Sequence, residues 1–146
     1  MEGKAVIGID PGKTTGVCVV LLKKSGKVDA INSMELSLGN LARELSELYY
    51  KFGWAYSYSL SVVIEDVVKT GRMNKDKFDQ IVAFERACST VNYKQKVIQP
   101  ENRKRHNIKV PKHVTGTHAR DAYRIAVAYM LQEGFISETS AGPGKK

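Results

Sequence analysis

The segment that most constrains this chain is a short apolar run that ends in one carboxylate and a turn. Residues 5–9 (AVIGI) are rich in β-branched side chains, and Asp10, Pro11 and Gly12 follow at once. Such a run is typical of a strand covered on both faces, and the Pro-Gly pair turns the chain after it. Asp10 would then lie at the exit of a central strand. A carboxylate is costly to desolvate there, so Asp10 either binds a cation or caps the turn.

Length and charge bound the class of protein. The 146 residues are enough for one domain with a hydrophobic core, and we expect a single domain over residues 1–136. Residues 137–146 end in Gly-Pro-Gly-Lys-Lys and are expected to form a flexible tail. The formal net charge of +8, from 23 Lys and Arg against 15 Asp and Glu, favours a polyanionic partner.

Cysteine use and hydropathy exclude several classes. Cys18 and Cys88 lie far apart in apolar segments, and no pair has the spacing of a zinc clip. We expect two buried thiols in a reducing compartment rather than a disulfide framework. The N-terminus lacks the apolar core of a signal peptide, and no apolar run approaches ~18 residues. We therefore expect a cytoplasmic protein with no membrane partner.

Five segments have the pattern of strands. Ser25-Gly26 is a hairpin signal between the second and third of them, so three antiparallel strands are expected to open the fold. The fourth is apolar on both faces, as a central parallel strand should be, and Pro100 stops the fifth. The expected strands cover residues 4–10, 14–23, 27–35, 60–68 and 97–99.

Three segments have the pattern of helices. Apolar residues at positions 38, 41, 45, 48 and 52 predict an amphipathic helix of about 14 residues, with Ala42 and Tyr49 in the same stripe. Gly53 is expected to end it. A second helix is expected over residues 78–93, and a third over residues 118–133, where Thr117 can serve as the cap.

An aromatic cluster follows the first expected helix. Trp54, Tyr56 and Tyr58 come directly after Tyr49, Tyr50 and Phe52. Such rings could stack on nucleic-acid bases. Packing at a helix-to-strand corner or at a subunit interface is the interpretation that the sequence favours.

Two segments concentrate positive charge. Residues 69–77 carry four cations and are expected to form a loop, while residues 101–112 carry five Lys and Arg and one His against a single acid. A run of this kind is usually a solvated loop. Beside a site built from carboxylates, a phosphate-binding loop is the better interpretation.

Three separate elements offer polar ligands in apolar surroundings. Asp10 ends the first strand, Glu65 lies within the fourth, and His118 and Asp121 share one face of the last helix. The first and fourth strands would be neighbours if the first helix is a right-handed crossover. Carboxylate oxygens with one imidazole favour Mg²⁺ or Mn²⁺, and two such ions can activate water for attack on a phosphodiester. A basic protein with this cluster is expected to be a nuclease.

The same residues carry a resemblance to a known family. The sequence IGIDPG ending at Gly12, the run VIE ending at Glu65 and the motif HARDA starting at His118 resemble the RuvC-type Holliday junction resolvases of the ribonuclease H-like superfamily. The resemblance covers roughly residues 4–132. It implies an α/β fold, ribonuclease H-like, with a mixed five-stranded sheet flanked by helices. It also implies a homodimer that makes paired, metal-dependent nicks in a four-way DNA junction.

The resemblance assigns roles to individual residues. Asp10 would bridge two Mg²⁺ or Mn²⁺ ions, Glu65 and Asp121 would be further ligands, and His118 falls where family members carry Asp or His. Lys104 is the candidate for a basic residue near the scissile phosphate. The loop over residues 70–74 would enter the junction centre, with Arg72 or Met73 in place of an aromatic wedge. The expected DNA-contacting residues are Lys13, Lys69, Arg72, Met73, Lys75, Arg103, Lys104, Arg105, Lys109 and Lys112.

Other functions remain open at this point. The chain is short for the cellular enzymes of this family, which suggests a compact bacterial or phage-encoded version. A nuclease for RNA or RNA–DNA hybrids would use the same carboxylates, and a junction-binding protein without catalysis would need none of them. An ATP-binding domain of the actin or sugar-kinase type has a similar first phosphate loop, but it needs two domains and a second such loop.

Overall fold

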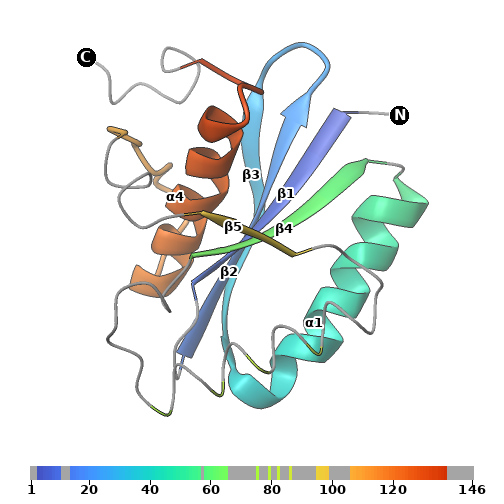
Figure 1. Cartoon of the computed structure of the whole chain (residues 1–146), viewed down its shortest axis with the longest axis vertical. Coiled ribbons are helices and arrows are strands. Elements are labelled where there is room, and N and C mark those ends of the chain that lie inside the picture. Colours follow the sequence, from blue (N-terminus) through green and yellow to red (C-terminus); the bar gives the residue numbers. More distant parts are fainter. Residues whose placement is uncertain are drawn as a thin grey trace.

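Five strands form one mixed sheet in the order β3-β2-β1-β4-β5 (Figure 1). The computed structural model describes residues 3–10, 14–56, 58–65, 75, 79, 82, 86, 95–98 and 106–137, with the backbone alone for Leu38, Glu65 and residues 95–98. Strands β1, β2 and β3 are antiparallel neighbours, whereas β4 runs parallel to β1 and β5 parallel to β4. The strands are β1 (Gly3–Asp10), β2 (Thr14–Lys23), β3 (Val28–Ser37), β4 (Ser59–Glu65) and β5 (Gln95–Ile98).

The predicted hairpin between β2 and β3 is confirmed. The Lys23 N–H donates to the Lys27 carbonyl at 2.9 Å, and the Gly26 N–H donates to the Lys23 carbonyl at 2.8 Å. Gly26 has a φ of 93°, a conformation in which glycine is favoured because it lacks a Cβ. The turn sets the register of the long β2–β3 ladder, which a bulge shifts between Val19 and Val20.

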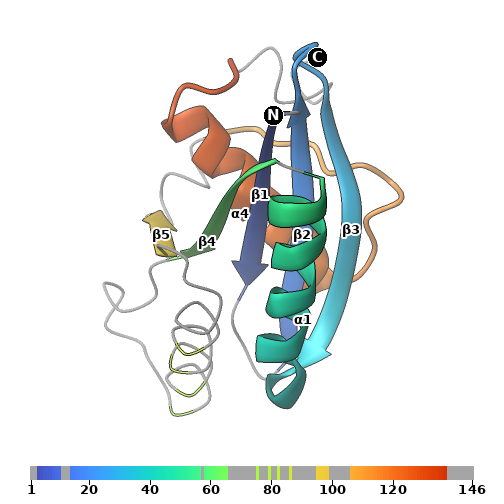
Figure 2. The ribbon, with the colours of Figure 1, turned by 90° about the vertical axis from the view of Figure 1, so that its right-hand side faces the viewer.

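Both faces of β1 are buried, as its apolar run predicts. Val6 belongs to one hydrophobic cluster, and Ala5, Ile7 and Ile9 belong to the other. Alternate residues of a strand point to opposite faces, so this single strand separates two layers of core. Helix α1 (Leu41–Leu48) covers the second cluster and helix α4 (Thr117–Gln132) covers the first, on opposite sides of the sheet (Figure 2).

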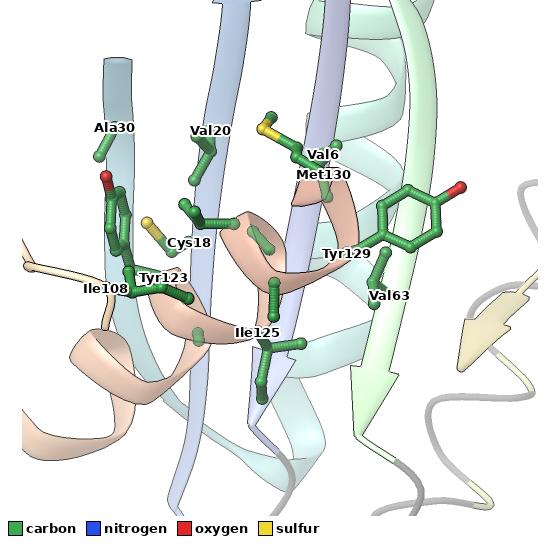
Figure 3. Packing of buried hydrophobic residues seen from close by; sticks show 14 of the residues in the cluster. Val6, Cys18, Val20, Ala30, Val63, Ile108, Tyr123, Ile125, Tyr129 and Met130 are labelled. Atoms are coloured by element: carbon green, nitrogen blue, oxygen red, sulfur yellow. The ribbon is translucent and has the colours of Figure 1, made fainter. Parts of the chain in front are cut away.

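The layer under α4 is tightly packed. Ile125 and Met130 of the helix lie against Val6, Val63 and the other apolar side chains of the sheet (Figure 3). Cys18 is a free, fully buried thiol in this layer, as expected, and burial raises its pKa to about 12. Residue Cys88 lies outside the described residues.

The first helical segment is longer than its sequence pattern predicts. A 3₁₀ turn, η1 (Leu38–Asn40), precedes α1, and a π-helical stretch, η2 (Tyr49–Ala55), continues it past Gly53. The expected end at Gly53 is therefore wrong. Phe52 remains in the buried stripe with Leu41, Leu45 and Leu48, whereas Ala42 is exposed and does not belong to it.

Two other local expectations need correction. Lys75 is helical rather than part of a loop, and its Nζ lies 3.1 Å from the Asp79 carboxylate one turn on. Asp79, Val82 and Arg86 are helical as expected, and the other residues of the predicted helix over 78–93 lie outside the described ones. The last helix begins at Thr117, and Gly116 occupies the N-cap position. The prediction that Thr117 caps this helix is therefore wrong.

The aromatic cluster divides between core and surface. Phe52 is buried and makes an edge contact with Tyr56 at 5.6 Å between ring centroids. Tyr50 and Trp54 are exposed, and 66% of Trp54 is accessible to solvent. Packing at the helix-to-strand corner therefore accounts for Phe52 but not for Trp54.

None of the helices in the described part of the chain is both long and apolar enough to cross a membrane.

Candidate active site at the carboxyl ends of β1 and β4

The ends of two parallel strands meet at one edge of the sheet. Ile9 of β1 is in register with Ile64 of β4, and each strand ends one residue later, β1 at Asp10 and β4 at Glu65. The Glu65 backbone also pairs with Ile98 of β5. The Glu65 side chain lies outside the described part of the chain, so the prediction that it shares a site with Asp10 stays a prediction. The edge where these strands end is a common place for ligands in open α/β sheets.

Helix α4 comes unusually close to the sheet at this edge. A Cβ at Gly16 would overlap the carbonyl oxygen of His118, and a Cβ at Gly8 would overlap the carbonyl oxygen of Ala122. Both strand positions are therefore restricted to glycine by the backbone of the helix itself. Without side chains at these positions, the first turns of α4 lie directly on β1 and β2.

This close approach brings His118 to Asp10. His118 Nδ1 lies 3.2 Å from Asp10 Oδ2, within hydrogen-bond distance. The Asp10 side chain is only 14% exposed, whereas that of His118 is 42% exposed. A neutral imidazole that donates from Nδ1 keeps its lone pair on Nε2, which is then available to a cation. The carboxylate is thus shielded on one side by a ring that solvent can reach.

Asp121 lies three residues further along the helix but has a different partner. Arg124 Nη1 donates to Asp121 Oδ1 at 2.8 Å. Over the described ranges, no three His, Cys, Asp or Glu side chains gather closely enough to hold a metal ion. The structure therefore brings together Asp10 and His118 of the four predicted ligands, and it places Asp121 on the same helix in an ion pair.

The donors at this edge suit a hard divalent cation. A carboxylate oxygen and an imidazole nitrogen are ligands that Mn²⁺ accepts, and carboxylates are the ligands that Mg²⁺ prefers. The Asp10 carboxylate lies at the end of a buried strand, where a cation would offset the cost of its desolvation. Arg124 occupies one oxygen of the Asp121 carboxylate, so a metal ion bound by that oxygen would compete with Arg124.

One residue of this edge was missed by sequence reasoning. Glu35 of β3 accepts hydrogen bonds at Oε2 from the backbone N–H groups of His118, at 2.8 Å, and of Ala119, at 3.2 Å. These are first-turn donors that have no partner within the helix. An acid at the end of a predicted strand was the available signal, but its partner lies 83 residues away in the chain.

Few of the predicted DNA-contacting residues are described. Lys109 and Lys112 are exposed on the segment that precedes α4, and this segment is anchored by the buried side chains of Ile108, Val110 and Val114. Lys75 is exposed and paired with Asp79. The predicted residues that lie outside the described part are Lys13, Lys69, Arg72, Met73, Arg103, Lys104 and Arg105.

The sheet order and the helices on both faces give an α/β fold of the ribonuclease H-like type. No protein-family model and no curated protein matches the sequence. Among solved structures, the chain is similar to Thermus thermophilus RuvC in complex with a Holliday junction substrate, with a TM-score of 0.71 over 90% of this chain and 96% of that one, at 14% identity. A second Thermus thermophilus RuvC structure gives a TM-score of 0.66 over 89% and 96% of the two chains, at 17% identity. The resemblance to RuvC is confirmed at the level of the fold.

Proposed function

We propose that this protein is a divalent-metal-dependent endonuclease that resolves four-way DNA junctions by paired nicks. The observation that carries the proposal is the Asp10–His118 pair at the carboxyl end of β1, in a chain with the fold of RuvC. A carboxylate held at this edge beside a solvent-accessible imidazole suits metal-assisted hydrolysis of a phosphodiester. The basic charge of the chain suits a DNA partner.

The residue roles that the resemblance to the RuvC-type resolvases implies are part of this proposal. Asp10, Glu65, His118 and Asp121 would hold Mg²⁺ or Mn²⁺, with two ions in each site. The bound ions would activate water and stabilise the leaving oxygen. Asp10 would bind through the carboxylate that His118 orients. Lys104 would contact the scissile phosphate.

The wider assembly is also a proposal. We place the nuclease in a single domain over residues 1–136, acting as a homodimer in the cytoplasm of a bacterium, in a cellular or phage-encoded form. Two copies would place one site at each of the two strands that a junction resolvase must cut. The predicted wedge in the loop over residues 70–74 belongs to this proposal.

The first experiment offers the purified protein a labelled four-way DNA junction in Mg²⁺, beside a linear duplex and an RNA–DNA hybrid of the same sequence. We expect symmetric nicks in the junction and little cleavage of the other two substrates. Cleavage of the hybrid in preference to the junction would indicate instead a nuclease that removes RNA from RNA–DNA hybrids. Tight junction binding without cleavage in either Mg²⁺ or Mn²⁺ would contradict the proposed nuclease activity and indicate a junction-binding protein without catalysis.

The affinity for the junction is expected to fall steeply with salt, by at least about a hundredfold between about 50 and 200 mM, because each neutralised phosphate releases counterions. Replacing both Lys109 and Lys112 with Ala should reduce the slope of log affinity against log salt by about two. Fluorescence anisotropy over a salt series measures the slope. Lys23→Ala is the control for the loss of a lysine, since Lys23 is ion-paired with Asp29 at the end of the sheet away from Asp10. An unchanged slope in the double variant would remove this segment from the DNA surface.

A further inference from the structure

Three neighbouring strands place Asp10, Gly16 and Glu35 in one row across the sheet. Gly16 of β2 is directly opposite Asp10 of β1 on one side and Glu35 of β3 on the other. Directly opposite residues in antiparallel strands point to the same face, which here is the face that α4 covers. The row therefore has a carboxylate at each end and a gap, without a side chain, between them.

The first turn of α4 occupies this gap. Its His118 carbonyl lies over Gly16, where a Cβ would overlap it. At one end of the row, the His118 ring meets Asp10, with 3.2 Å between Nδ1 and Oδ2. At the other end, Glu35 Oε2 accepts the backbone N–H groups of His118 and Ala119. The same residue of the helix is thus held by its side chain on one side and by its backbone on the other.

The residue before α4, Gly116, leaves space for the Glu35 carboxylate because it has no side chain. Gly116 has a φ of 94°, and a Cβ there would lie 2.6 Å from Glu35 Oε2. Gly116 also has no side chain with which to cap the helix, so the carboxylate takes the place that a Ser, Thr or Asp cap normally fills. A negative charge at this position is favoured by the helix dipole as well.

We propose that Glu35 is a positioning residue of the candidate site, which fixes the first turn of α4 so that His118 faces Asp10. The inference rests on the proposed function only for its catalytic consequence, because the contacts themselves exist without substrate. A displacement of the turn by ~1 Å would lengthen the Nδ1–Oδ2 distance beyond that of a hydrogen bond. Glu35 therefore acts on the metal ligands through the helix and not by touching the reacting atoms.

Three substitutions of Glu35 separate the effect of side-chain length from the effect of negative charge. Glu35→Gln keeps an oxygen at the same reach and removes the charge, Glu35→Asp keeps the charge and shortens the reach by one methylene, and Glu35→Ala removes both. Glu47→Gln, at an exposed position on α1, is the matched control. A positioning role predicts that Glu35→Gln resembles the wild type and that Glu35→Asp and Glu35→Ala do not. A role for the negative charge alone predicts the opposite order for Gln and Asp.

The first readout is independent of activity. In Glu35→Asp and Glu35→Ala, the amides of His118 and Ala119 should exchange with solvent at least about tenfold faster than in the wild type, as measured by NMR. The imidazole ¹⁵N shifts of His118 should move toward those of Asp10→Asn. Wild-type exchange rates and shifts in both variants would overturn the inference. If Glu35→Ala does not fold, the comparison of Gln with Asp decides the matter alone.

The second readout is the Mn²⁺ concentration that gives half-maximal junction cleavage. We expect it to rise about tenfold or more in Glu35→Asp, with the rate at saturating Mn²⁺ reduced far less. An unchanged Mn²⁺ requirement would overturn the catalytic consequence. If the wild type cuts no substrate while the amides and the imidazole respond as expected, the proposed function fails and the positioning of His118 by Glu35 stands.

Discussion

The Asp10→Asn variant is expected to cut junction DNA at least about a thousandfold more slowly than the wild type, because it loses the anionic oxygen that the proposed metal site requires. Junction affinity should stay within about threefold, since phosphate contacts elsewhere supply most of it. The fold should persist, because an Asn oxygen can still accept a hydrogen bond from His118. Single-turnover cleavage in Mg²⁺ and a binding titration in Ca²⁺ measure the two quantities separately.

Asp29→Asn is the matched control for this substitution. Asp29 is also a partly exposed carboxylate on the same sheet, but its partners are Lys23 and Lys27 at the end of the sheet away from Asp10. Its loss should leave cleavage unchanged. A normal cleavage rate in Asp10→Asn would contradict the assignment of the site, whereas equal losses in both variants would point to a general effect of lost charge.

The Gly16→Ala variant is expected to lose about 3 kcal/mol of folding free energy, because its new methyl group would overlap the backbone of α4 at His118. The methyl group can be accommodated only if the helix moves away from β2. Such a shift also separates His118 from Asp10, so cleavage should fall even at temperatures where the variant is folded. Urea unfolding measures the first effect, and cleavage well below the midpoint measures the second.

Gly39→Ala provides the control for the loss of a glycine. Among the described residues, no atom outside the adjoining chain lies within 4 Å of the Cβ position at Gly39, and its backbone needs no positive φ. Its free energy of unfolding should change by less than about 0.5 kcal/mol. A Gly16→Ala variant as stable as the wild type would show that α4 does not pack directly on Gly16. It would also contradict the explanation of how His118 is positioned.

Much of the fold could be predicted because its signals are local. The apolar run before Asp10, the Ser25-Gly26 turn and the apolar run of β2 are visible in short windows of sequence. The end of the first helix was missed because it depends on packing. Phe52 is buried against the sheet, and the helical segment that carries it continues through Gly53 to Ala55. Tertiary contact overrides the local preference at that point.

The candidate site was only partly predictable for the same reason. Residue type and motif predict Asp10 and His118 as site residues, and the structure places them together. The Asp121–Arg124 pair spans three residues of one helix, a spacing at which side chains on a helix meet, so its signal was present and was not used. Glu35 could not be found in this way. Its role depends on the register of two strand ladders and on where a distant helix rests.

The contacts that hold His118 also bear on how the protein is made. Asp10 and His118 are 108 residues apart in the chain, and Glu35 and His118 are 83 apart. Closing loops of this length is slow and entropically costly, so such contacts form late in folding. A chain emerging from the ribosome can pair β1, β2 and β3 before α4 has been synthesised. The Asp10–His118 pair then forms only when the last helix docks, so an unfinished chain carries the sheet without its proposed nuclease site.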